Sequence, residues 1–120
     1  MGTINGTGKN DSINGTGGAD SILADAGNDT VNAGDGNDSV YGGDGNDSVL
    51  GGNGDDAIYG GAAYDKLWGE AGNDVIYGGT DNAQDDIYGG SATTRCMAAT
   101  RPSRSGCIMT TGSGAMTAMT

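Results

Sequence analysis

The sequence predicts an all-β fold in which glycine-rich turns alternate with short strands and stack into coils. The first observation is a nine-residue period of single aliphatic residues between Ile13 and Ile76. The second is an acid two residues before each of them. The third is a glycine-rich stretch of six residues that ends on each acid, which suits tight turns and disfavours helix. Together they predict a repeated turn followed by a three-residue strand.

The two linked positions recur eight times without a slip. The aliphatic positions are Ile13, Ile22, Val31, Val40, Val49, Ile58, Leu67 and Ile76, and the acids are Asp11, Asp20, Asp29, Asp38, Asp47, Asp56, Asp65 and Asp74. The aliphatic residue is expected to point inward and its two neighbours outward, as strand alternation requires. Because nine residues make half a coil, residues eighteen apart should stack in one sheet. Val31, Val49 and Leu67 then line one sheet, and Ile22, Val40, Ile58 and Ile76 line the opposite one.

The turns vary along the chain. Thr stands at the second place of residues 6–11 (GTGKND) and 15–20 (GTGGAD). Leading glycines are missing from 24–29 (ADAGND) and 33–38 (AGDGND), whereas 42–47 (GGDGND) and 51–56 (GGNGDD) are complete. Ala63 replaces the fourth-place glycine of 60–65 (GGAAYD), and Glu70 occupies the second place of 69–74 (GEAGND). The stretch 78–88 is two residues longer, which predicts a longer loop before Ile87.

The charge distribution favours cations as partners. All 16 acids lie between Asp11 and Asp86, and residues 1–90 hold only Lys9 and Lys66 against them, a net charge of 2 − 16 = −14. Such a body should repel nucleic acid and anionic membranes. No run of 18 apolar residues exists, so no membrane insertion is expected. Every Asp has a repeat counterpart, so none is singled out as an acid or a base, and the chain is not predicted to be an enzyme.

The spacing of the acids predicts calcium sites. Stacked strands lie about 4.8 Å apart, which brings acids eighteen residues apart within reach of one ion. One edge would hold Asp11, Asp29, Asp47 and Asp65, and the other Asp20, Asp38, Asp56 and Asp74. Calcium accepts about six to eight oxygens, whereas magnesium demands tighter geometry. Zinc and copper favour His or thiolate, and the chain has no His. The predicted core is small for the residues it must order, so folding should depend on the ion.

Residues 42–50 (GGDGNDSVL) and 51–59 (GGNGDDAIY) match the pattern G-G-x-G-x-D-x-U-x. The tandem pattern, over roughly residues 3–90, resembles the calcium-binding nonapeptide of RTX (hemolysin-type) proteins. The resemblance implies a right-handed parallel β-roll that holds several calcium ions (about three to six) between turns, through the closing Asp and turn carbonyls. It also implies a secreted bacterial protein that is exported by a type I secretion apparatus. A monomer is expected, and the start in mid-repeat at Thr3-Ile4-Asn5 suggests a fragment of a larger RTX protein.

The resemblance also assigns metal-site residues. They are Asp11, Asp20, Asp29, Gly34, Gly36, Asp38, Gly43, Gly45, Asp47, Gly52, Gly54, Asp56, Asp65, Gly72 and Asp74. The turn pairs that fit the pattern best are 33–38 with 51–56, 51–56 with 69–74, and 24–29 with 42–47. Turns 6–11 and 15–20 fit less well, and 60–65 departs from the pattern at Ala62, Ala63 and Tyr64.

Two alternatives remain open at this point. The closing Asp could merely cap its turn. The outer column Tyr41, Tyr59, Trp68, Tyr77 and Tyr88 could bind glycans, which would make the chain an extracellular adhesive or spacer module. The structural alternative is that these rings only cover strand edges.

The repeat ends at Gly89-Gly90, and residues 91–120 are predicted to form a disordered, non-repeat tail. They contain no acid, both cysteines and the only proline. A Cys96–Cys107 disulfide is one alternative for an exported protein. In the neighbouring reading frame Met-Thr becomes Asp and Met-Ala becomes Gly, and Thr93–Thr100 can read DNEMYGGD. A one-base slip near Ser91 that scrambled further repeats is therefore the hypothesis for this tail.

Overall fold

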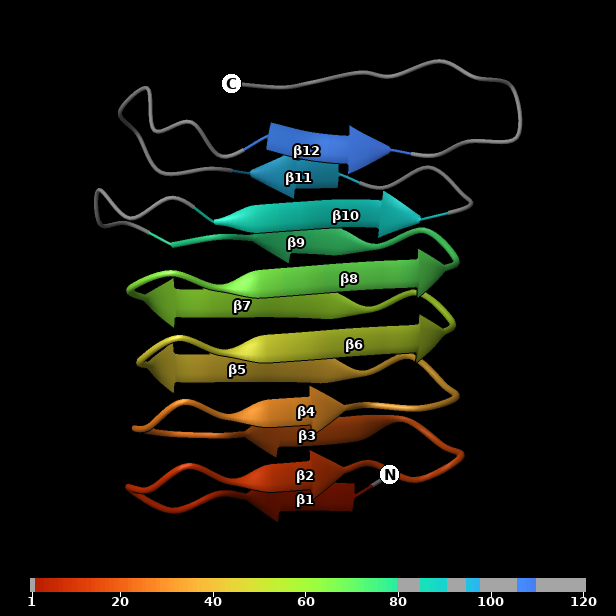
Figure 1. Cartoon of the computed structure of the whole chain (residues 1–120). Helices are drawn as coiled ribbons and strands as arrows, with labels where there is room; N and C mark the ends of the chain where they lie inside the picture. Colours follow the sequence, from red (N-terminus) through yellow and green to blue (C-terminus); the bar gives the residue numbers. More distant parts are fainter. Residues whose placement is uncertain (1, 80–84, 91–94, 98–105, 110–120) are drawn as a thin grey trace.

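Two parallel sheets enclose one core, and each coil of the chain contributes one strand to each sheet (Figure 1). The computed structural model describes residues 2–79, 85–90, 95–97 and 106–109. Sheet A contains β1 (Gly2–Asn5), β3 (Asp20–Leu23), β5 (Ser39–Asp44), β7 (Ala57–Ala62), β9 (Val75–Tyr77) and β11 (Arg95–Met97). Sheet B contains β2 (Ser12–Asn14), β4 (Thr30–Asn32), β6 (Ser48–Asn53), β8 (Lys66–Ala71), β10 (Asp86–Gly90) and β12 (Gly106–Met109). Consecutive strands alternate between the sheets, so the fold is the predicted all-β parallel solenoid.

The register confirms that nine residues make half a coil. Val31 pairs with Val49 in sheet B, and Val40 pairs with Ile58 in sheet A, each eighteen residues away. The step rises to twenty residues at β10, where Ile87 pairs with Leu67. The two extra residues therefore belong to the connection before β10, of which residues 80–84 lie outside the described part of the chain.

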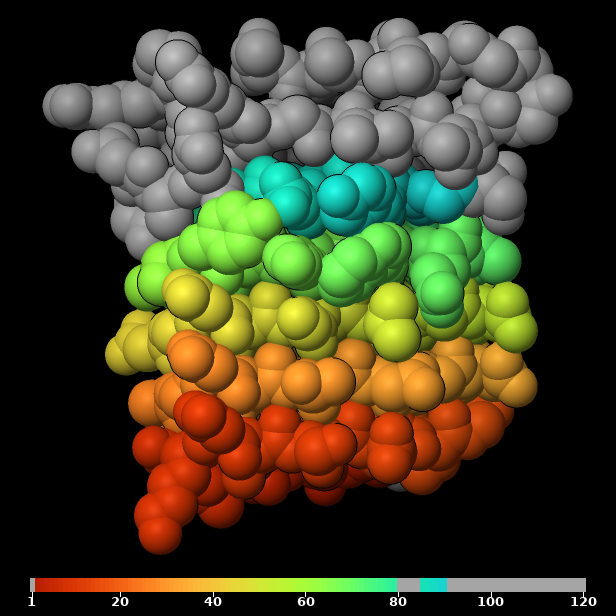
Figure 2. All heavy atoms as spheres, in the orientation of Figure 1, coloured from red at the N-terminus to blue at the C-terminus, as the bar shows by residue number. Residues whose placement is uncertain are grey.

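A single file of aliphatic side chains from each sheet fills the interior. The predicted inward residues are all buried, from Ile13 at 8% exposed to Ile76 at 0%. Ala24, Ala33 and Ile87 complete this core. Their strand neighbours point outward, as on β4, where Val31 is buried between exposed Thr30 and Asn32. The coils follow one another as successive layers in the order of the sequence (Figure 2). The part of the chain that the structure describes contains no helical segment with the length and hydrophobicity of a membrane span.

Both sheets continue past Gly90 over two short strands, β11 and β12. Strand β11 pairs with β9 and places Cys96 opposite Ile76, and β12 pairs with β10 and places Cys107 opposite Ile87. The physical reason is that the last strand of a sheet offers unpaired backbone groups, which accept a further strand even where the repeat is lost. The predictions for the rest of residues 91–120, and for the cysteine side chains, fall outside the described residues.

Candidate metal centre

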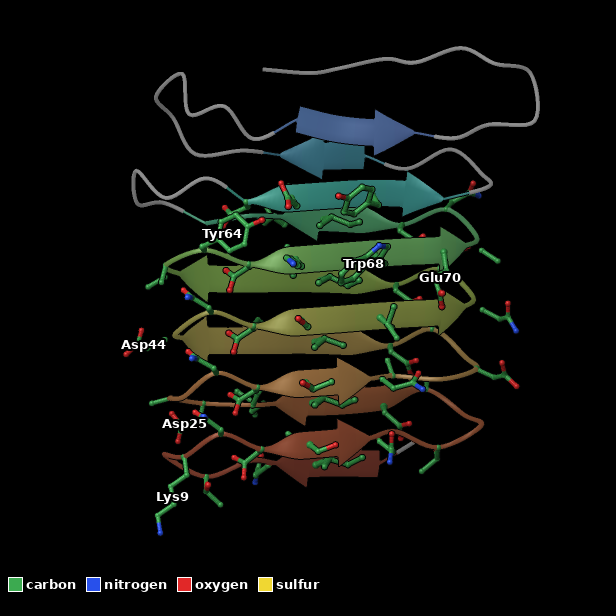
Figure 3. All side chains as sticks on the ribbon, in the orientation of Figure 1. Lys9, Asp25, Asp44, Tyr64, Trp68 and Glu70 are labelled. Atoms are coloured by element: carbon green, nitrogen blue, oxygen red, sulfur yellow. The ribbon has the colours of Figure 1, made fainter. Side chains whose placement is uncertain are left out.

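Each six-residue turn ends on an Asp, and these residues form two columns along the opposite edges of the solenoid. Asp29, Asp47, Asp65 and Asp85 precede strands of sheet B, and Asp38, Asp56 and Asp74 precede strands of sheet A. All of these carboxylates are at most 4% exposed. Figure 3 shows Asp25 and Asp44, from turns of the first column, on one edge and Glu70, from a turn of the second, on the other. The structure thus places the predicted acids in the two predicted columns.

One oxygen of each carboxylate binds the preceding coil. The amide of Asp29 donates to Oδ1 of Asp47 at 2.8 Å, and the amide of Asp38 donates to Oδ1 of Asp56 at 2.9 Å. The same bond, at 2.8–3.0 Å, joins the pairs Asp11–Asp29, Asp20–Asp38, Asp47–Asp65, Asp56–Asp74 and Asp65–Asp85. The columns are therefore continuous ladders in which a carboxylate accepts from the backbone one coil below.

The other carboxylate oxygen has no hydrogen-bond partner in five of these residues. The Oδ2 atoms concerned are buried and belong to Asp29, Asp38, Asp47, Asp56 and Asp74. A buried polar atom that makes no hydrogen bond costs on the order of 1–3 kcal/mol, and more when it is charged. A cation beside each Oδ2 would remove that cost, so these residues fit a bound metal ion.

Further oxygens lie close to the free Oδ2 atoms, at the first place of the turns. A Cβ built on Gly42 would lie 2.6 Å from Oδ2 of Asp47 and 2.6 Å from the carbonyl oxygen of Gly60. The bare glycine therefore leaves a space bounded by a carboxylate and by a carbonyl of the next coil. No group of three or more His, Cys, Asp or Glu side chains that could hold a metal occurs among the described residues. Carboxylate and carbonyl oxygens of this kind are the ligands that a hard cation such as calcium prefers.

The glycines that the resemblance assigned to the site stand at the second and fourth places and have left-handed backbones. Examples are Gly52 at φ +100° and Gly54 at φ +123°. A Cβ on Gly54 would lie 2.1 Å from the carbonyl oxygen of Gly36, one coil below. The same pair of conformations recurs in turn 60–65 at Gly61 (φ +108°) and Ala63 (φ +76°). These positions set the close approach of the coils, and turn 60–65 keeps the left-handed pair despite its unusual composition.

A second ladder, missed by sequence reasoning, runs along the fifth place of the turns. The amide of Asn46 donates to Oδ1 of Asn28 at 2.8 Å, and the amide of Asn73 donates to Oδ1 of Asp55 at 2.9 Å. These side chains are exposed and accept from the coil above, opposite in direction to the buried Asp ladder. The recurrence of Asn or Asp just before most of the closing Asp residues was the available signal, because both side chains accept backbone hydrogen bonds in turns.

Burial shifts the titration of the column acids. It raises the pKa of Asp47 to about 6 and that of Asp74 to about 7. The hydrogen bond from a backbone amide lowers the pKa of each carboxyl, but burial outweighs it, and neighbouring carboxylates add to the rise. Burial likewise raises the pKa of Asp56 to about 6. The pKa of Asp20 is instead lowered, chiefly by the hydrogen bond from the amide of Thr16. Asp47, Asp56 and Asp74 are thus poorly suited to hold their charge without a counter-ion.

We expect the calcium-free chain to regain β structure on acidification. The pKa of these Asp side chains is higher in the folded chain than the unfolded value near 3.8. At a pH between the two values the folded state binds more protons than the unfolded state, so the free energy of unfolding rises as the pH falls. Far-UV circular dichroism in chelator should therefore show more β signal at about pH 5 than at about pH 8. With calcium present the trend should reverse, because protons compete for the carboxylates. A β signal that falls with acidification in chelator would contradict the burial of these acids.

The outer aromatic residues form two stacks rather than the single column expected. Tyr41, Tyr59 and Tyr77 stack on sheet A with ring centroids 4.7 and 4.9 Å apart and planes within 3°. Trp68 and Tyr88 stack on sheet B at 5.4 Å. Residues nine apart lie on opposite sheets, which is why the set divides. Each inner ring face is covered by the neighbouring ring, and this geometry favours the edge-covering alternative.

The comparisons with known proteins agree with this geometry. The RTX calcium-binding nonapeptide repeat matches the chain in four copies, at residues 2–31, 14–49, 25–58 and 50–84. No curated protein and no solved structure gave a significant match. The four copies together span residues 2–84, most of the chain, and coincide with the stacked turns and their ladders of buried carboxylates. The chain therefore belongs to the RTX calcium-binding nonapeptide repeat family.

Proposed function

We propose that this β-roll binds several calcium ions between successive turns on each edge and that it folds only when they are bound. The observation that carries the proposal is the row of buried Oδ2 atoms without a hydrogen-bond partner in the part of the chain that the structure describes. When these carboxylates are ionised and have no counter-ion, their burial opposes folding. When a divalent cation neutralises them, they link consecutive coils. Binding and ordering then become one event, as in other proteins whose metal sites do not exist in the unfolded chain.

The ligands in this proposal come from both coils of each pair. The carboxylates are those of Asp29, Asp38, Asp47, Asp56, Asp65 and Asp74, and turn carbonyls supply the remaining oxygens. The left-handed glycines bring these turns together, namely Gly34, Gly36, Gly43, Gly45, Gly52, Gly54 and Gly72. Calcium suits this set because it accepts a large, irregular shell of oxygens, whereas magnesium keeps its waters and a strict octahedron.

Calorimetric titration of Asp38→Asn against Asp35→Asn tests the proposal. Both acids belong to turn 33–38 and both changes remove one negative charge, but Asp38 is 2% exposed and Asp35 lies on the surface. Asp38→Asn should lose one ion or weaken one site by at least about 10–100-fold, the loss that even outer-shell partners cause. Asp35→Asn should keep the wild-type stoichiometry. Equal effects of the two changes would contradict the assignment of the buried column as the ligands.

Calcium-dependent folding would also suit the chain to export. We infer that it is a repeat module of a larger secreted bacterial RTX protein, which passes a type I secretion apparatus unfolded and orders outside the cell. The density of buried acids supports this inference, because it favours an unfolded chain wherever calcium is scarce. Circular dichroism of the wild-type protein at submicromolar and at millimolar calcium follows the switch directly.

A further inference from the structure

The first two turns differ from the six that follow. In every turn from 24–29 to 69–74 the second and fourth residues have left-handed backbones, including Asp25 (φ +80°) and Glu70 (φ +71°) where glycine is missing. No residue of turns 6–11 and 15–20 has a positive φ. The second place in these two turns is Thr7 and Thr16. A β-branched residue strongly disfavours the left-handed region, so the threonines impose another turn.

In these two turns the threonine binds the closing Asp. The amide of Thr16 donates to Oδ2 of Asp20 at 2.6 Å, and its hydroxyl lies 2.9 and 3.0 Å from Oδ2 and Oδ1. The amide and hydroxyl of Thr7 reach Asp11 in the same way, at 2.5 Å for the amide and 2.9 and 3.0 Å for the hydroxyl. Each hydroxyl also accepts an amide two residues on, at 3.2 Å. The threonine therefore closes a local turn around the carboxylate.

The corresponding atom in the next coil is an Oδ2 that has no hydrogen-bond partner. Oδ2 of Asp38, directly above Asp20 in the same column, is one such atom, as is Oδ2 of Asp29 above Asp11. Two donors from threonine thus stand at Asp11 and Asp20 where a cation would stand in the later turns. The closing carboxylate therefore accepts hydrogen bonds from threonine in the first coil, whereas in the next coil its Oδ2 has no hydrogen-bond partner.

We propose that Thr7 and Thr16 take the place of calcium in the first coil, so that the ion series begins with Asp29 and Asp38 and the first coil is a metal-free cap. The inference rests on the proposed function and narrows it. It removes Asp11 and Asp20 from the ligands that the sequence resemblance implied. It also names the second place of the turn as the position that decides between an ion and a hydrogen-bonded carboxylate.

Calorimetric stoichiometry with Asp20→Asn and Asp38→Asn gives the first test. Asp20→Asn should bind as many ions as the wild type, and Asp38→Asn should bind one fewer. Loss of an ion in Asp20→Asn would overturn the inference while leaving the calcium function intact. A wild-type chain that takes up no calcium would overturn both.

Thr16→Gly gives the second test, because Gly18 already stands at the fourth place of that turn. The variant should gain one ion over the wild type, since its turn can adopt the left-handed pair and leaves Oδ2 of Asp20 without a donor side chain. Thr16→Val is the control: it removes the hydroxyl but keeps the β-branched backbone preference, and it should gain no ion. A folded Thr16→Gly variant with unchanged stoichiometry, or an equal gain in Thr16→Val, would overturn the inference.

Discussion

Removal of calcium at neutral pH should abolish the β-sheet circular dichroism of this protein, and millimolar calcium should restore it. A charge left unpaired in a protein interior costs about 3–5 kcal/mol, so a few vacated carboxylate sites exceed the roughly 5–15 kcal/mol that stabilises a domain. The described core offers little to offset this loss, because it consists of one small aliphatic side chain per half-coil and a few alanines. On the proposed function, the stability of the folded chain should therefore depend on the ions.

Two controls separate this effect from a general salt effect. Magnesium at the same concentration should fail to restore the signal, because magnesium demands strict octahedral geometry and gives up its waters reluctantly. Sodium chloride at equal ionic strength should also fail, since screening acts weakly on buried charges. A β signal that persists in chelator at neutral pH would show that the carboxylate ladders do not need a cation.

Gly54→Val should be among the most damaging single substitutions on the turns. Gly54 has φ +123°, a region closed to β-branched residues, and its Cβ would meet the carbonyl oxygen of Gly36 at 2.1 Å. Strain and overpacking together should cost at least about 3 kcal/mol, which lowers the Tm by about 15 °C or prevents folding. Thermal unfolding in saturating calcium, followed by circular dichroism, measures the loss.

Gly17→Val is the matched control for that substitution. Gly17 lies in the threonine turn, has no positive φ, and a Cβ there would meet no atom within 4 Å. Its effect on the free energy of unfolding should remain within about 0.5 kcal/mol. Equal losses of stability in the two valine variants would contradict this account.

Ala63 shows why valine is a sharper probe than alanine. Turn 60–65 accepts a Cβ at its fourth place, where Ala63 stands. The neighbouring hydrogen bond from the amide of Gly45 to the carbonyl of Ala62 is 3.3 Å long, whereas the equivalent bond from Gly54 to Ala71 is 2.9 Å long.

The sequence was sufficient for the features that its period encodes directly. Val31, Val49 and Leu67 stack as predicted, because residues eighteen apart share a sheet once nine residues make half a coil. The Asp columns follow from the same arithmetic. The different roles of the two carboxylate oxygens could not be predicted from spacing, since Oδ1 accepts an amide one coil away whereas Oδ2 has no hydrogen-bond partner.

Other features depend on conformation rather than on the period. Thr16 looks like a minor deviation in a glycine-rich turn, and its effect appears only in the backbone angles and in the bonds to Asp20. The pairing of Cys96 with Ile76 was not predictable from composition, because the backbone edge of the sheet selects a strand without regard to the repeat. The aromatic residues were grouped by the motif position that they share, and the alternation of sheets separates them.

The sharing of one turn type by both edges gives this fold a pseudo-twofold screw symmetry. Turns 42–47 and 51–56 lie on opposite edges yet have the same left-handed pair, at Gly43 and Gly45 and at Gly52 and Gly54. Loss or duplication of a single nonapeptide therefore exchanges the two edges without misplacing any inward side chain. A gene that gains or loses such units can lengthen or shorten the roll in half-coil steps, whereas an insertion that is not a multiple of nine must be absorbed in a loop, as it is before β10.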